Sequence, residues 1–419
     1  MLKQLILENW KSFRYAELPL DPLTVLIGTN ASGKSNVVEA LEFLQRTFIK
    51  KDVKPALLGD STLSSIRGGL EWAALKPEKQ FTLQAVISGE NEYTDYIYSI
   101  TIQTKPIICI LNESIISQNY QNNGEEKPKN IFCFKASSNL SNYDRKIDVF
   151  ENDVVSSVIW GDIFSKTQTI LNDASSGFLS ELNQDMADKI YNLIQYIENI
   201  FILNPLPYKM RNYSIVYDKL EGDASNIAGV LAALSDEQKA AIESTLSEYI
   251  KYLPGGDIQR VWAEKVGRFG TDAMLYCQEE WKPGHITEID ARSMSDGTLR
   301  FLAILTALLT RPEGSQIVIE EIDSGLHPSR AELLVRILRE IGSKRKIDIL
   351  LTTHNPALLD ALGPEIVPFV VVAHRDNETG ESKLTLLEDI ENFPKLFASY
   401  SLGDMTTKGA IERSLSHGE

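Results

Sequence analysis

The segment Gly28–Ser35, with the sequence GTNASGKS, most constrains what this chain can fold into. It fits the pattern G-x-x-x-x-G-K-[ST], which needs a loop that joins the end of a strand to the start of a helix. The run Leu23–Ile27 before it is apolar and β-branched, as in a buried strand. After it, apolar residues repeat at helical spacing and predict a helix over Asn36–Phe48. The flanking pattern is therefore that of a phosphate-binding loop.

In such a loop, backbone N–H groups and the helix N-terminus hold phosphates. We expect Lys34 to reach the β- and γ-phosphates of ATP and the Ser35 hydroxyl to ligate Mg²⁺. ATP and Mg²⁺ are thus the expected cofactors. The residues assigned to nucleotide binding are Asn30, Ala31, Ser32, Gly33, Lys34, Ser35 and Asn36.

A second motif places two carboxylates after a short apolar strand, Gln316–Ile319. The carboxyl end of such a strand is where α/β proteins bind ligands. We expect Glu320 to bind Mg²⁺, directly or through water, and Glu321 to orient or deprotonate the attacking water. An acidic pair after a strand is commonly a solvated loop, but the sequence DSGLHP over Asp323–Pro328 favours the functional interpretation.

Two further motifs follow the same logic. A strand is expected over Ile347–Thr352, and His354 follows it. This histidine can hydrogen-bond a γ-phosphate, although a lone histidine at a strand end is more often structural. On the N-terminal side of the strand Gln316–Ile319, Ser295 and Gly297 precede an apolar helix that is expected over Leu299–Leu309. They would form an anion site at the helix N-terminus without a lysine, and Ser295 is also expected to cap the helix.

The remaining pattern predicts an α/β protein with a helical middle. Four closely spaced strand-like runs predict an antiparallel meander: Phe81–Ile87, Tyr93–Gln103, Ile107–Leu111 and Asn130–Phe134. Apolar stripes predict one helix over residues 179–197 and a second that begins at the capping box Ser235-x-x-Gln238. A third late strand is expected over Ile366–Val372. We divide the chain into 1–115, 116–257, 258–375 and 376–419: two ATPase halves, a partly helical insert between them, and a tail.

The charge, hydrophobicity and cysteine content of the chain argue against several classes of protein. The net charge of −16 argues against autonomous, non-specific DNA binding, and the short basic run Tyr208–Arg211 is interpreted as a solvated turn. No apolar run approaches the ~18 residues that span a bilayer. The N-terminus does not have the pattern of a signal peptide, so a cytoplasmic protein without membrane contact is expected. Three widely spaced cysteines argue against a disulfide framework.

Together, these motifs resemble those of ABC-type ATPases of the RecF/SMC branch, closest to the RecF-like or OLD-like "AAA family" ATPases of bacteria. Asn9–Phe13 (NWKSF) is similar to the N-terminal strand of that branch. The whole similarity covers about 1–115 and 258–375. Glu320 departs from the Asp of many relatives. The other motifs correspond as follows: Gly28–Ser35 resembles Walker A, Met294–Thr298 the signature motif, Glu320–Glu321 Walker B, residues 324–328 the D-loop, and His354 the switch histidine. Gln80, Gln84 and Arg67 remain candidates for the Q-loop position.

The resemblance implies a P-loop NTPase of ABC type, with a mixed central sheet, an antiparallel β subdomain and a helical insert lobe. It also implies a homodimer that sandwiches two ATP molecules and can assemble further. In that dimer, Ser295 and Gly297 would reach the γ-phosphate bound to the partner.

Three roles remain open on the sequence. The first is a regulatory or scaffolding ATPase of bacterial anti-phage defence with a separate effector, a nuclease or toxin. The second is a RecF-like repair or recombination ATPase that acts on nucleic acid. The third, an OLD-like nuclease, is disfavoured because residues 373–419 are too few for a further domain of about 100 residues. A GTPase is disfavoured because no Asn-Lys-x-Asp occurs, and a transporter subunit because NWKSF does not fit one.

Overall fold

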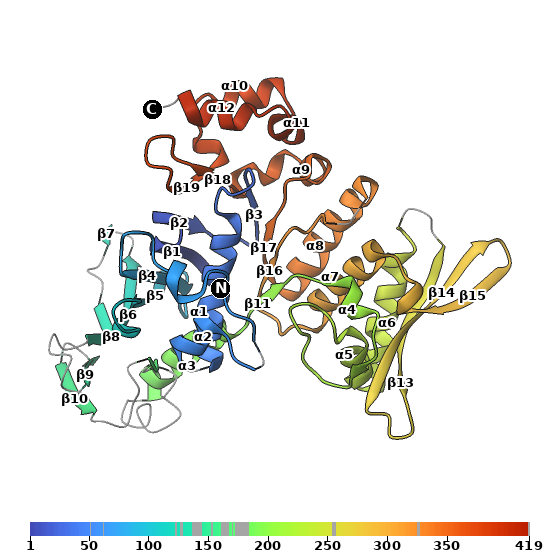
Figure 1. Ribbon diagram of the computed structural model, residues 1–419, viewed down its shortest axis with the longest axis horizontal. Coiled ribbons are helices and arrows are strands. Elements are labelled where there is room, and N and C mark those ends of the chain that lie inside the picture. Colours follow the sequence, from blue (N-terminus) through green and yellow to red (C-terminus); the bar gives the residue numbers. More distant parts are fainter. Residues whose placement is uncertain are drawn as a thin grey trace. The chain divides into compact units, whose positions relative to one another are not determined.

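In the computed structural model, drawn in Figure 1, the chain divides into two units. Unit 1 comprises 1–21, 28–200 and 371–385, and unit 2 comprises 22–27, 201–370 and 386–419. The four segments expected from the sequence follow motifs along the chain and stay a prediction. The residues described are 1–50, 52–61, 63–121, 124–125, 129–135, 145–151, 154–160, 167–169, 171, 184–253, 257–324 and 327–417.

Unit 1 contains a large antiparallel sheet. In it β1 (Leu2–Trp10) lies between β2 (Phe13–Pro19) and β4 (Gln80–Ser88). The sheet continues through β5 (Thr94–Gln103), β6 (Cys109–Gln121), β8 (Lys129–Lys135), β9 (Arg145–Glu151) and β10 (Val154–Trp160), with β7 (Gly124–Glu125) beside β6. The predicted meander is confirmed, and it is longer than the sequence pattern indicated because β9 and β10 extend it.

Helix α1 (Lys34–Lys50) packs against this sheet through an aromatic cluster. The ring of Trp10 lies 4.8 Å from that of Phe81 and 5.8 Å from that of Phe43, and all three side chains are fully buried. The indole of Trp10 also donates to the carbonyl oxygen of Asn36 at 2.7 Å. The first turn of α1 is therefore fixed to the β1–β2 turn. Beside α1 lie α2 (Val53–Leu58) and α3 (Gln184–Glu198), with the 3-10 turn η1 (Gly69–Trp72) next to α2.

Unit 2 is built around parallel strands. β17 (Asp348–Thr352) lies between β16 (Gln316–Ile319) and β3 (Leu23–Ile27), and both pairs are parallel. Nearly every residue of the three strands is buried, as expected for a parallel sheet covered on both faces. Helix α8 (Ala331–Arg345) packs on β17 and on α7 (Asp296–Thr310). The carboxyl ends of β16, β17 and β3 therefore lie at one edge of the sheet.

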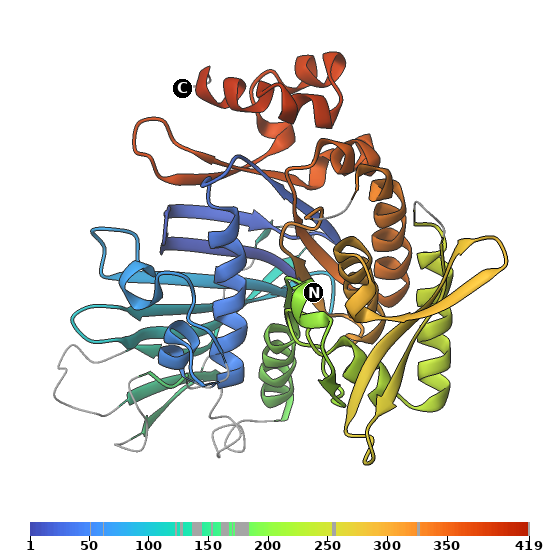
Figure 2. The ribbon, with the colours of Figure 1, turned by 45° about the vertical axis from the view of Figure 1, so that its right-hand side comes forward.

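A second sheet of unit 2 is antiparallel and was not predicted. Its order is β12 (Ser214–Ile215), β14 (Asp272–Lys282) and β13 (Ile258–Val266), with β15 (His285–Asp290) also beside β14. Helices α5 (Ile227–Ala233) and α6 (Asp236–Ile250) pack on it (Figure 2). The predicted cap of α6 is confirmed, since the Ser235 hydroxyl accepts from the Gln238 N–H at 3.4 Å.

The end of the chain departs from one expectation. The predicted strand Ile366–Val372 starts too early, because the 3-10 segment η6 (Pro364–Phe369) precedes β18 (Val370–Arg375). Pro364 and Pro368 explain this, since proline has no N–H to donate to a ladder. The other elements are β11 (Ile200–Leu203), α4 (Pro207–Met210), η4 (Ala291–Ser293), η5 (Pro328–Arg330), α9 (Pro356–Leu362), β19 (Ser382–Leu386), η7 (Leu387–Asp389), α10 (Phe393–Ser399), α11 (Leu402–Thr407) and α12 (Ala410–His417).

The α/β class predicted from the sequence is confirmed, with parallel strands at the motifs, an antiparallel sheet and a helical region. The predicted helix over 179–197 is found as α3, and residues 172–183 lie outside the described part of the chain. Within that part, none of the helices has the length and apolar character that a membrane crossing requires.

Candidate functional site

The loop Gly28–Ser35 has the backbone that its glycines permit. Gly28 has a φ of 143°, and a Cβ added there would lie 2.2 Å from the carbonyl oxygen of Ala373. Gly33 has a φ of 116°, and its Cβ would meet the ring of Phe13 at 2.8 Å. A side chain at either position is excluded by both conformation and space. The loop then enters α1 at Lys34, as the motif requires.

Polar groups of the loop suit an anionic ligand. The ammonium of Lys34 donates to the carbonyl oxygens of Gly28 at 2.5 Å and of Thr29 at 2.9 Å, so the side chain folds back over the loop. The buried hydroxyl of Ser32 finds no hydrogen-bond partner among the residues described. Buried hydroxyls normally have one. A phosphate group that accepts from these donors would fit the loop.

Arg375 anchors the loop to the strand β18. Its Nε donates to the carbonyl oxygen of Ala31 at 3.0 Å, and its Nη1 donates to that of Gly380 at 2.6 Å. The β18–β19 turn is itself held by Asp376, whose carboxylate accepts from Lys383 and from the backbone of Thr379. These bonds hold the pKa of Asp376 well below its usual range.

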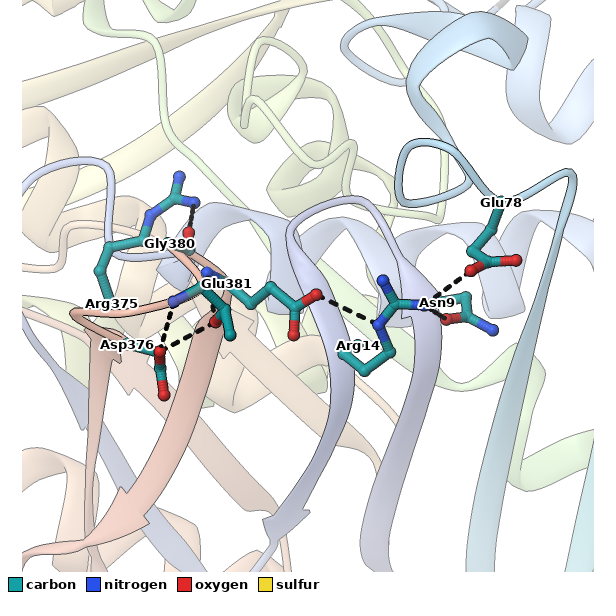
Figure 3. A network of polar contacts seen from close by, with 8 residues as sticks. Asn9, Arg14, Glu78, Arg375, Asp376, Gly380 and Glu381 are labelled. Carbon is teal, nitrogen blue, oxygen red and sulfur yellow. Dashed lines mark hydrogen bonds and ion pairs between the residues drawn. The ribbon is translucent and has the colours of Figure 1, made fainter. Parts of the chain in front are cut away.

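Arg14 joins the same turn to the N-terminal strands (Figure 3). Its guanidinium binds Glu381 at 3.1 Å, Glu78 at 2.7 Å and the side-chain oxygen of Asn9 at 3.3 Å. Hydrogen bonds to Glu78 and then Glu381 raise the pKa of Arg14. The network fixes the segments that surround the phosphate-binding loop in unit 1.

Asn36 and the NWKSF turn contact each other directly. The amide of Asn36 donates to the Ser12 hydroxyl at 2.7 Å, and Ser12 also bonds the Ser382 hydroxyl at 2.8 Å. Assigned to nucleotide binding from the sequence, Asn36 thus has a structural contact within the protein. The sequence pattern gave no sign of this pairing with the turn.

The Q-loop candidate Arg67 lies beside the same turn. Its Nε binds Glu39 at 3.1 Å, and its carbonyl oxygen accepts from Lys11 at 2.8 Å. Lys11 also pairs with Glu39, and burial lowers the pKa of Lys11. Gln80 and Gln84 lie in β4. The position of a Q-loop residue stays a prediction.

In unit 2 the two carboxylates follow β16 as predicted. The N–H of Glu320 donates to the carbonyl oxygen of Leu203 at 3.3 Å. Glu321 is exposed and has a φ of 47°. Residues other than glycine and asparagine rarely adopt this left-handed backbone conformation. Its N–H donates to the Thr352 hydroxyl at 2.8 Å. Sequence reasoning missed Thr352, because its partner lies 31 residues away along the chain.

His354 follows β17 and is exposed. Its predecessor Thr353 donates its hydroxyl hydrogen to Asp323 at 2.5 Å. In the predicted D-loop, Gly325 and Leu326 lie outside the described residues. His327, which follows them, caps η5 by accepting from the Ser329 N–H at 3.3 Å.

The signature segment begins α7. The exposed Ser295 caps the helix by accepting from the Thr298 N–H at 3.1 Å, which confirms the predicted cap, and Gly297 is buried in the first turn. Arg211 donates to the carbonyl oxygen of Met294 at 2.9 Å and to Asp296 at 2.6 Å. The interpretation of Tyr208–Arg211 as a solvated turn was therefore wrong for Arg211. Nothing local in the sequence points to this bond, since Arg211 and Met294 are 83 residues apart.

No group of three or more His, Cys, Asp or Glu side chains that could hold a metal occurs in the described part of the chain. The expected Mg²⁺ does not need such a group, because Mg²⁺ keeps several waters and binds one or two carboxylates together with substrate phosphates. The hydroxyl of Ser35 and the carboxylate of Glu320 are of the kind that Mg²⁺ accepts.

Three solved structures that match this chain are SMC heads. The structure titled "Crystal structure of the SmcHead bound to the C-winged helix domain of ScpA" is 11% identical, with a TM-score of 0.51 over 92% of this chain and 96% of that one. An SMC head domain from Thermotoga maritima is 14% identical, with a TM-score of 0.41 over 92% and 98%. An Smc head with an extended coiled coil, bound to a ScpA domain derived from Pyrococcus furiosus, is 12% identical, with a TM-score of 0.46 over 95% and 99%. The first of these shows the SMC-head fold.

Family models identify the domain type. The model described as "AAA ATPase domain" matches residues 1–200. A second model, described as "AAA domain, putative AbiEii toxin, Type IV TA system", matches residues 135–360, more than half of the chain. A search of curated proteins finds no match. With its P-loop and its SMC-head fold, the chain belongs to this second family of AAA ATPase domains.

Proposed function

We propose that this protein binds ATP at Gly28–Ser35 and hydrolyses it with Glu321 as the general base. One observation carries the proposal: β3, β17 and β16 are parallel neighbours whose carboxyl ends share an edge. The phosphate-binding loop, Glu320 and Glu321, and His354 follow those three strands directly or within two residues of the chain. Ligands of α/β proteins bind at such an edge.

Each residue then has a chemical task. Lys34 pairs with the β- and γ-phosphates, and Ser35 and Glu320 hold Mg²⁺, which neutralises phosphate charge when bound. Glu321 accepts a proton from water as the water oxygen bonds to the γ-phosphorus. The bond from that phosphorus to the bridging oxygen breaks, and its electron pair leaves on ADP. The proton on Glu321 passes to solvent, and His354 hydrogen-bonds the γ-phosphate throughout.

ATP also joins two copies of the chain in this proposal. Ser295 is exposed at the N-terminus of α7, a 15-residue helix, and such an end favours an anion. Together with the buried Gly297 beside it, Ser295 would contact the γ-phosphate held by a second copy. Contacts made only in the closed dimer shift the equilibrium towards it, and hydrolysis removes them. Any larger homo-oligomer would be built from such dimers.

We further propose that the ATPase regulates or scaffolds a separate nuclease or toxin in bacterial anti-phage defence, in the cytoplasm. The description of the matched family, which names a toxin and a toxin–antitoxin system, supports this role. The net charge of −16 counts against the RecF-like alternative, which needs a DNA-binding surface. A small nuclease or toxin gene beside this one would support the defence role, and replication genes would count against it.

Phosphate release from purified protein tests the catalytic proposal. Wild type is expected to hydrolyse ATP only with Mg²⁺. Glu321→Gln is expected to lower kcat by about 100-fold or more, because loss of a general base typically costs at least that much, while ATP affinity stays. Lys34→Ala is expected to lose ATP binding. A normal rate in Glu321→Gln would refute the role of that residue. Glu313→Gln, at an exposed site before β16, is the matched control and should behave as wild type.

A further inference from the structure

We infer that Thr352 and Thr353, the last residue of β17 and the one after it, are positioning residues for Glu321 and His354. The inference rests on the proposed function, since it concerns how the general base is aimed. Neither threonine touches a reacting atom in this account. Their hydroxyl groups hold the two segments of backbone that carry the exposed side chains of Glu321 and His354.

The Glu321 peptide is held by Thr352 from two sides. Its N–H donates to the Thr352 hydroxyl at 2.8 Å, and the N–H of the next residue, Ile322, donates to the Thr352 carbonyl oxygen at 3.2 Å. At Glu321 the φ of 47° is unfavourable for any residue that has a side chain. Such a conformation persists only where the surroundings fix it. The bonds to Thr352 provide that constraint.

Thr353 makes the equivalent contacts on the other side of the turn. Its hydroxyl donates to Asp323 at 2.5 Å and accepts from the N–H of Asn355 at 3.0 Å. The turn after β16 is closed by a further bond, from the Ser324 N–H to the Glu321 carbonyl oxygen at 2.8 Å. The bond to Asn355 spans His354, so one hydroxyl links the segment that carries His354 to the segment that carries Glu321.

Burial makes these threonines rigid supports. Both are 1% exposed, whereas Glu321 and His354 are exposed. A β-branched side chain is restricted at χ1, so the hydroxyl of the buried Thr352 has few other positions. Valine has nearly the same shape and would pack in the same place. The hydroxyl is therefore needed for its hydrogen bonds rather than for its volume.

The deciding experiment compares Thr352→Val, Thr352→Ser and Thr353→Val with wild type in steady-state ATP hydrolysis. A reacting group displaced by about 1 Å loses on the order of 100-fold in rate. Thr352→Val and Thr353→Val are thus expected to lower kcat by about 10- to 100-fold, with KM and ATP affinity unchanged. Thr352→Ser keeps the hydroxyl and is expected to restore most of kcat.

Thr306→Val is the matched control. Thr306 is fully buried in α7, and its hydroxyl has no hydrogen-bond partner among the residues described. The same loss of a buried hydroxyl there should leave kcat unchanged. If Thr352→Val does not fold, Thr352→Ser and Thr353→Val decide the question.

Wild-type kcat in both valine variants would overturn the inference, and so would equal losses in Thr352→Ser and Thr352→Val, since packing would then matter and not the hydroxyl. The proposed function fails in a different way, when wild type does not hydrolyse ATP or when Glu321→Gln remains active. Active wild type, inactive Glu321→Gln and fully active valine variants would overturn this inference alone.

Discussion

At Glu321, the second residue after β16, the chain adopts a φ of 47°, a conformation that glycine adopts more readily than glutamate. The conformation turns the chain immediately after the buried strand, so that an exposed carboxylate follows a fully buried segment. An unfavourable conformation at the carboxyl edge of a sheet supports the catalytic role proposed for Glu321, because such conformations cluster at active sites.

Replacing Glu321 by glycine and by alanine tests whether this backbone conformation carries a cost. Both changes remove the carboxylate, but only alanine retains the penalty of the left-handed region. We expect Glu321→Gly to be more stable than Glu321→Ala by about 1 kcal/mol in urea unfolding. The same pair of changes at exposed Glu313, where φ is not positive, should give the opposite order. Equal stability of the two variants at position 321 would contradict the conformation described.

Residues with a local pattern could be predicted from the sequence, and those with distant partners could not. Ser295 was expected to cap α7 because a serine before an apolar helix is a local signal, and it does so. Thr352 and Arg211 carry no such signal. Their partners, Glu321 and Met294, lie 31 and 83 residues away along the chain, so only the fold brings them together.

Among the elements, α7 joins the signature segment to the core of unit 2. Its apolar residues are buried almost throughout, while its first turn is exposed at Ser295 and Asp296. Arg211, just after the short helix α4, holds that turn through Met294 and Asp296. The start of α7 is therefore set by a contact from another segment as well as by its own cap.

Arg211→Ala tests that contact in the Glu321→Gln background, where the closed dimer is expected to accumulate. Loss of hydrogen bonds made by a charged group costs roughly 1.5 kcal/mol, and about 1.4 kcal/mol corresponds to tenfold in an equilibrium constant. We expect the dimer formed with ATP to be about tenfold weaker. Lys209→Ala removes an exposed ion pair with Asp223 nearby and should change little. Unchanged dimerisation of Arg211→Ala by sedimentation would argue against this role of the contact.

The antiparallel sheet of unit 2 shows why some strands could not be predicted from the sequence. β15 is exposed along most of its length and β13 mixes charged with apolar residues, so neither has the apolar run of a buried strand. Their stability comes from cross-strand pairs such as Trp262 and Tyr276, whose rings stack 5.8 Å apart. By contrast, β16 and β17 are buried throughout, and their apolar runs were sufficient to predict them.

On the scale of the whole molecule, the proposed dimer would join two copies that each carry a net charge of −16. Their mutual repulsion opposes closure, and salt at about 0.15 M screens charges beyond about 8 Å. ATP with Mg²⁺ therefore has to supply the attraction, through contacts that each copy makes with the nucleotide held by the other. The central claim of the proposed mechanism is therefore that ATP with Mg²⁺ is required for two copies of the chain to associate.

Mass photometry of Glu321→Gln at about 0.15 M salt, with and without ATP and Mg²⁺, tests that claim most directly. We expect the mass to double from the 46.9 kDa of one chain, or to rise to larger even multiples, only when ATP and Mg²⁺ are both present. A Glu321→Gln variant that also carries Ser295→Arg should still bind ATP but show no increase in mass. The arginine side chain would occupy the space needed by the γ-phosphate of the ATP that the second copy binds. A mass that stays the same whatever the nucleotide, in protein that binds ATP, would contradict the account.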